Sequence, residues 1–129
     1  MVFYVFYIWC LTVLMFRTRV RAVRSGEISL KFFRAYSGAT PGERTVVVGR
    51  HYDNQFQVPV LFFAACIANI AMGEVGISTA VLAWLFVASR LFHSWVHLGS
   101  NNVRHRVMAF ATGWFILMLM WLQLAYFAV

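Results

Sequence analysis

The sequence contains few charged residues, very few acidic ones and only two cysteines. Charged side chains make up 12% of the 129 residues, and four of them are acidic, whereas about a quarter of the residues in a soluble globular domain are charged. With 62% hydrophobic residues, the composition also excludes a disordered or collagen-like chain. Cys10 and Cys66 both lie inside apolar runs, which excludes a disulfide scaffold and a cysteine-based zinc site. The composition therefore indicates an integral membrane protein, and the length allows one domain.

The basic residues give the chain a formal net charge of +7. Most of them lie between the first two apolar runs and two lie between the last two, so that only Arg90 is inside a run. Basic loops beside membrane spans are typical of a cytoplasmic face. A chain that places most of its residues in lipid also has little surface for a polynucleotide, so we expect no nucleic-acid partner.

Four apolar segments have about the length that a helix needs to cross a bilayer. We predict an all-α membrane protein, a four-transmembrane-helix up-down bundle, with spans at about 1–16, 50–72, 77–98 and 107–129. The first segment is interpreted as a span and not as a cleaved signal peptide. The reason is that no basic residue precedes its apolar stretch and no small-residue cleavage site follows it.

The connections between these spans set the expected orientation. A long loop at about 17–49 and a short one at 99–106 carry nearly all of the arginines. The positive-inside rule places both loops in the cytoplasm and both chain termini outside it. Within the long loop, only the stretch 37–42 is plainly irregular in composition.

Polar residues gather at the cytoplasmic end of the predicted spans, on two helical faces. The first face begins the second span and consists of Arg50, Asp53, Asn54 and Gln57. The second face ends the third span and consists of Arg90, His93 and His97. Four further arginines flank the same end, namely Arg17, Arg19, Arg104 and Arg106. Because the spacing in each set is that of one helix face, we expect the two faces to meet inside the bundle.

Arg90 is the one charge expected well inside a span. An unpaired guanidinium in hydrocarbon is costly, so we expect Arg90 to donate hydrogen bonds to Asp53, Asn54 or Gln57. The alternative is a purely structural role, in which Arg90 is hydrogen-bonded to Gln57 between helices and takes no part in chemistry.

The other polar residues in the spans receive structural interpretations. His93 and His97 are one helical turn apart, but no carboxylate or cysteine completes a ligand set, so no metal site is predicted. Asn69 and Gln123 are interpreted as contacts between packed helices.

A cluster of arginines and amides beside the membrane suits a small polyanion, because guanidinium groups bind carboxylates bidentately. Apolar surroundings suit a lipophilic second substrate that arrives from the bilayer. Glutathione, with two carboxylates and a thiol, has the required chemistry. An arginine near its sulfur would favour the thiolate, which is the nucleophilic form.

Two motifs in this arrangement resemble a known family. The second span opens on Arg50-x-x-x-Asn54-x-x-Gln57-x-Pro59, and the third closes on Arg90-x-x-His93-x-x-x-His97-Leu98-Gly99. Together with four spans and a long basic first loop, they resemble the MAPEG family, the membrane-associated proteins in eicosanoid and glutathione metabolism. The likeness covers nearly the whole chain, and its short length is similar to that of bacterial members.

The resemblance implies a homotrimer that binds glutathione between neighbouring subunits near the cytoplasmic side. It implies that Arg106 activates the thiol. The residues that it implies for glutathione binding are Arg17 or Arg19, Arg50, Asn54, Gln57, Arg90 and His93. The chain differs from the family pattern at four positions, where Gln57 replaces a glutamate, His97 and Phe110 replace tyrosines, and Val107 replaces a serine.

Two functions of different classes remain. The favoured one is a membrane-bound glutathione-dependent transferase or peroxidase that acts on lipophilic electrophiles, because Arg106 is present. The alternative is a non-catalytic protein of the same fold that binds lipid or a partner protein. A transporter is less favoured, because the outer half of the bundle offers no polar path. The expected location is a bacterial inner membrane.

Overall fold

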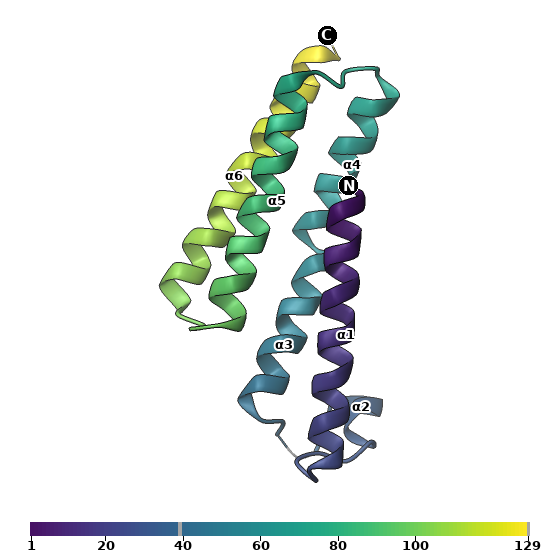
Figure 1. Cartoon of the computed structure of the whole chain (residues 1–129), viewed down its shortest axis with the longest axis vertical. Helices are drawn as coiled ribbons and strands as arrows, with labels where there is room; N and C mark the ends of the chain where they lie inside the picture. Colours follow the sequence, from purple (N-terminus) through teal and green to yellow (C-terminus); the bar gives the residue numbers. More distant parts are fainter. Residues whose placement is uncertain (39, 129) are drawn as a thin grey trace. The chain divides into compact units, whose positions relative to one another are not determined.

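The computed structural model describes residues 1–38 and 40–128. Residue 39, within the stretch predicted to be irregular, and residue 129, at the end of the predicted fourth span, lie outside the described residues. The chain forms two compact units, Val2–Asp53 and Asn54–Val129, which we call the N-terminal and C-terminal units. Figure 1 shows their helices.

The described residues of the N-terminal unit form three helices. These are α1 (Val2–Arg24), the short α2 (Phe32–Ala35) and α3 (Glu43–Asp53), with α3 packed against α1. The α1 helix ends where Gly26 adopts a left-handed conformation, at φ 74°. The following loop is fixed by Glu27, whose Oε1 accepts hydrogen bonds from the Gly42 amide and the Thr45 hydroxyl.

The C-terminal unit contains a 3-10 turn and three longer helices. They are η1 (Asn54–Phe56), α4 (Val58–Ala71), α5 (Ile77–Leu98) and α6 (Val103–Phe127). The α5 and α6 helices lie side by side along their length (Figure 1). Because the chain reverses after α4 and again after α5, the beginning of α6 lies beside the end of α5, whereas α4 begins partway along α5 (Figure 1).

Ring stacking and side-chain amide contacts hold the C-terminal unit together. Phe62 of α4 and Phe86 of α5 are fully buried and stack at a centroid distance of 4.5 Å. Near the other end of α5, Gln123 donates to Ser78 at 2.8 Å and to Thr79 at 3.0 Å. The interpretation of Gln123 as an interhelical contact is therefore confirmed. Asn69 instead donates to Ala65, within its own helix.

Among the residues that the structure describes, four helical segments are long and apolar enough to cross a membrane. They are Val2–Arg24, Glu43–Ala71, Ile77–Leu98 and Val103–Phe127. Many large apolar side chains on them are exposed, as expected for helices that face lipid or other helices. The prediction of an all-helical membrane protein with four apolar helices is confirmed in the part of the chain that the structure describes.

Helices continue beyond the predicted spans into segments that were expected to be loops. The α1 helix runs on to Arg24, α3 begins at Glu43, and α6 begins at Val103. Hydropathy indicates where the chain leaves the membrane, whereas a helix ends at a capping residue. Asn102 caps α6 by accepting hydrogen bonds from the amides of Arg104 and His105. The flanking arginines of α1 and α6 are therefore helical residues.

Candidate functional site

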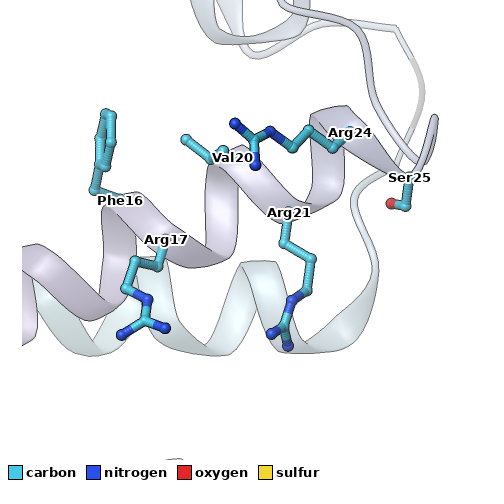
Figure 2. A pocket seen from close by; sticks show the side chains of 6 residues that line it. All are labelled: Phe16, Arg17, Val20, Arg21, Arg24 and Ser25. Carbon is cyan, nitrogen blue, oxygen red and sulfur yellow. The ribbon is translucent and has the colours of Figure 1, made fainter.

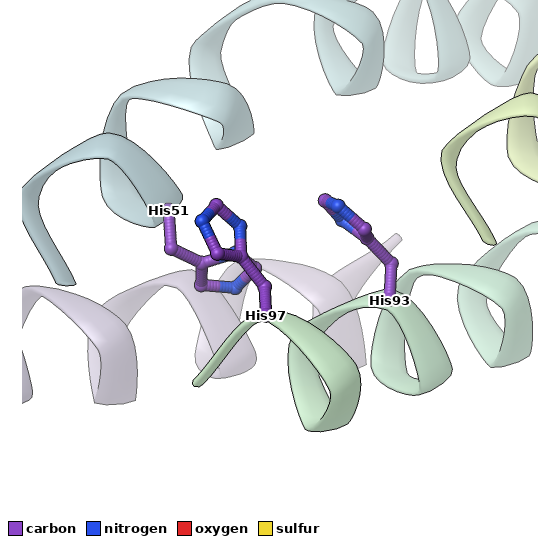
Figure 3. Close-up of side chains that lie close together, drawn as sticks. All are labelled: His51, His93 and His97. Carbon is purple, nitrogen blue, oxygen red and sulfur yellow. The ribbon is translucent and has the colours of Figure 1, made fainter. Parts of the chain in front are cut away.

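The buried polar face of α5 is the centre of the candidate site. Arg90, His93 and His97 are each at most 2% exposed, as their spacing on one helical face predicts. The rings of His93 and His97 project from successive turns of α5 (Figure 3), with centroids 5.4 Å apart. Figure 3 also draws His51, which belongs to α3 of the N-terminal unit.

Arg90 is a fully buried cation whose guanidinium lies over an aromatic ring. Its Cζ atom is 5.5 Å from the centroid of the Phe110 ring on α6. None of its three guanidinium nitrogens has a hydrogen-bond partner among the described residues of its unit. The prediction that Arg90 pairs with Asn54 or Gln57 is therefore wrong. Asp53, the third expected partner, belongs to α3 in the other unit.

A glycine lets α6 approach the stem of Arg90 closely. A Cβ atom added at Gly113 would lie 3.2 Å from the Ser89 hydroxyl and 3.5 Å from the Arg90 Cδ atom. Small residues at helix contacts allow such an approach in membranes. The Arg90 side chain thus extends between α5 and α6 and reaches the face of the Phe110 ring. This ring also contacts His93 edge-on, with the two ring centroids 5.8 Å apart.

Arg106 is held in place by two side chains. Its Nη1 donates to Asn101 Oδ1 at 3.0 Å and lies 3.4 Å from His97 Nε2. Because a guanidinium can only donate, His97 Nε2 must be the unprotonated ring nitrogen in this contact. Both contacts among the described residues use Nη1, so the donors on Nε and Nη2 remain for a ligand.

Asn101 is a site residue that the sequence analysis did not identify. It adopts a left-handed conformation at φ 50° in the turn between α5 and α6, a conformation that asparagine tolerates better than most residues. The signal was present in the sequence Gly99-Ser100-Asn101-Asn102, which is typical of a turn followed by a helix cap.

The motif of the second span is divided between the two units. Asn54 and Gln57 belong to the C-terminal unit, where Asn54 is half-buried in η1 and Gln57 is exposed at the break before α4. Arg50 is exposed on α3 of the N-terminal unit. In that unit His51 is buried, with Nε2 3.3 Å from the Tyr7 hydroxyl.

The two candidate arginines of α1 differ in their surroundings. Arg19 donates to the Tyr36 hydroxyl at 3.3 Å, and its Cζ lies 5.1 Å from the centroid of the Phe33 ring. Arg17 is exposed and lines a cavity on α1. The structure thus brings Arg90, His93 and Arg106 together in the C-terminal unit through His97 and Phe110, whereas Arg17, Arg19 and Arg50 lie in the N-terminal unit.

Four apolar helices, with a buried guanidinium and two buried histidines at one end of α5, define an integral, multi-pass membrane protein. The sequence model of the MAPEG family matches residues 1–126, and the chain belongs to this family. Neither a curated protein nor a solved structure matches the chain. The expected family membership is therefore confirmed, and with it a place among the membrane proteins of eicosanoid and glutathione metabolism.

Proposed function

We propose that this protein is a glutathione-dependent transferase or peroxidase that acts on lipophilic electrophiles. The observation that carries the proposal is the fixed position of Arg106, which Asn101 and His97 hold through a single guanidinium nitrogen. A guanidinium with donors left over can stabilise a thiolate beside it, which raises the fraction of the nucleophilic form. The thiolate sulfur then attacks the electrophilic carbon, and the leaving group departs with the bonding electrons.

The buried Arg90 fits an anionic co-substrate. Its three nitrogens lack a hydrogen-bond acceptor among the residues described in its unit, and a buried cation without an acceptor is costly. A carboxylate of glutathione would supply acceptors in the bidentate geometry that a guanidinium prefers. The Phe110 ring, which His93 contacts edge-on, gives this part of the site an apolar surface that suits a lipophilic electrophile.

The remaining assignments rest on family membership. Arg50, with Arg17 or Arg19, would bind the carboxylates of glutathione, and Asn54 and Gln57 would bind its polar backbone. Residues from both units would then take part, in a homotrimer with glutathione between subunits. Both termini would lie outside the cytoplasm, and the membrane would be a bacterial inner membrane.

A specific observation favours the alternative, a non-catalytic MAPEG-fold protein that binds lipid or a partner protein. Phe110 occupies a position where the family resemblance implies a tyrosine. Its ring contacts both Arg90 and His93 but has no hydroxyl to donate. Gln57 likewise offers an amide where the resemblance implies a carboxylate.

A set of matched substitutions separates the two functions. Arg106→Ala should lower the rate of conjugation of a lipophilic electrophile at saturating glutathione, while the glutathione Kd stays within about threefold, because Arg106 acts on reactivity. Arg50→Ala should weaken binding first, since it removes a carboxylate contact. Arg104→Ala, which removes an exposed arginine from the same turn of α6, is the control and should change neither quantity. Absence of conjugation in the parent protein, with the lipophilic compound still bound, would favour the non-catalytic function.

A further inference from the structure

The arginine-rich end of α1 carries a cavity that the proposed enzyme function does not use as a whole. It has a volume of about 440 Å³ and is lined by Phe16, Arg17, Val20, Arg21, Arg24 and Ser25. Figure 2 shows Arg17 and Arg21 extending from the same side of the helix, while Arg24 extends beside Val20. Three arginines and two apolar side chains therefore line this cavity within about two helical turns, with the Arg24 guanidinium turned toward Val20 and away from those of Arg17 and Arg21.

A second, mostly apolar cavity adjoins the first. It measures about 350 Å³ and shares Phe16, Val20 and Arg24 with it. Its other lining residues are Arg19, Val23, Leu30 and Phe33. Arg19 is already engaged by Tyr36 and the Phe33 ring, so the lining of this cavity is chiefly hydrocarbon and aromatic. A basic cavity on α1 thus continues into a mostly apolar one that Leu30 and Phe33 of the following segment also line.

The residues that line the first cavity include three arginines and no acidic residue. Glu27 lines a third cavity that shares Arg17 and Arg21 with the first and also contains Arg44, so the arginines outnumber the carboxylate there by three to one. Glu27, the nearest acidic residue in sequence, accepts hydrogen bonds from the Gly42 amide in the loop after α2 and from the Thr45 hydroxyl of α3. The cavity also lies where α1 changes from apolar residues to arginines, which is where a membrane-spanning helix leaves the hydrocarbon.

We propose that these two cavities together form a binding site for an anionic phospholipid. Arg21 and Arg24, with Arg17, bind the phosphate and any further anionic group of the headgroup, because guanidinium forks match phosphate oxygens. Phe16, Val20 and Val23 contact the first carbons of an acyl chain. Basic pockets beside transmembrane helices on the cytoplasmic side recognise anionic headgroups in this way. The site does not depend on whether the protein turns over glutathione.

The test measures lipid retained by the purified full-length protein in mild detergent, by native mass spectrometry, with phosphatidylglycerol and phosphatidylcholine as probes. The parent protein should retain phosphatidylglycerol in preference. Arg21→Gln/Arg24→Gln should weaken this binding roughly tenfold or more, since each basic residue near the surface contributes about 1 kcal/mol. Lys31→Gln/Arg34→Gln removes the same charge from the exposed α2 region, outside both cavities, and should leave binding unchanged.

Two further arms distinguish a lipid site from a site for free phosphate and from a general effect of positive charge. Val20→Trp keeps every charge but fills space in both cavities, so it should also lower retention of phosphatidylglycerol. Inorganic phosphate at millimolar concentration should not displace the lipid, because it cannot use the apolar cavity. Any of three results would overturn the proposal. They are an equal loss of phosphatidylglycerol binding in the two double variants, equal retention of phosphatidylglycerol and phosphatidylcholine, and full displacement of the lipid by inorganic phosphate. Circular dichroism of every variant checks that the helices are intact.

Discussion

Asn101 Oδ1 accepts a hydrogen bond from Arg106 Nη1 at 3.0 Å, across the turn that joins α5 to α6. The contact fixes the guanidinium beside His97, which lies next to His93 on the buried face of α5. His97 contacts the same nitrogen at 3.4 Å, so one residue of the turn and one residue of α5 together hold the Arg106 guanidinium. The proposed reactivity of Arg106 depends on this arrangement.

Substitution of either holding residue should therefore affect reactivity more than affinity. We expect Asn101→Ala and His97→Phe each to lower the conjugation rate roughly tenfold, the effect of losing one hydrogen bond to a charged group. The glutathione Kd should change little. His105→Phe alters an exposed histidine of α6 and serves as the control. If all three variants behaved like the parent, Arg106 would not depend on these contacts.

In the absence of glutathione, Arg90→Met should raise the Tm of the protein. It should also reduce the increase in Tm that glutathione causes. The substitution removes a buried cation that lacks an acceptor among the described residues of its unit, and apolar replacements of buried charges are often neutral or stabilising by about 1–4 kcal/mol. Thermal unfolding in detergent, with and without glutathione, measures both effects. Arg104→Met is the exposed control. A lower Tm together with an unchanged glutathione response would show that Arg90 has a structural partner and no ligand.

Phe110→Tyr should increase turnover if the site is catalytic. The ring can keep its contacts with Arg90 and His93, while the new hydroxyl supplies a donor near them. Phe110→Leu removes the ring and should lower stability by about 1–2 kcal/mol, because the cation–π contact is lost. Steady-state kinetics of the two variants beside the parent would show whether the hydroxyl matters. A tyrosine variant with no gain in rate would support the non-catalytic function.

Gly113→Ala should be tolerated, whereas Gly113→Leu should separate α5 from α6. The nearest atoms to an added Cβ are the Ser89 hydroxyl at 3.2 Å and Cδ and Nη1 of the flexible Arg90 side chain at 3.5 and 3.9 Å, but a longer side chain would enter the space that Arg90 occupies. Overpacking of this kind costs about 1–3 kcal/mol. The Tm of the two variants in detergent tests the difference. Equal Tm values would mean that α5 and α6 do not pack closely at Gly113.

Hydropathy and helical spacing predict a large part of this molecule. The four apolar helices follow from the length of the apolar runs, and the buried face of Arg90, His93 and His97 follows from their spacing. Neither hydropathy nor helical spacing predicts the residue at which a helix begins or ends. Gly26 ends α1 and Asn102 begins α6, and both lie in charged segments that composition alone assigns to loops.

Side-chain partners were harder to predict than helices. Spacing indicates that a residue lies on a buried face, but which neighbour it meets depends on the rotation and approach of the facing helix. Gly113 allows α6 to approach Arg90, so that this guanidinium meets Phe110 where a hydrogen-bond acceptor was expected. Arg19 is similarly engaged by Phe33 and Tyr36, which are separated from it by a loop.

We propose that Arg106 favours ionisation of the thiol of bound glutathione to the thiolate. Ultraviolet difference absorbance of the purified protein on addition of glutathione measures the thiolate directly, before any electrophile is present. We predict a signal near neutral pH that saturates with glutathione, is lost in Arg106→Ala and is retained in Arg104→Ala. A parent protein that binds glutathione without any thiolate signal, or a signal that persists in Arg106→Ala, would contradict the account.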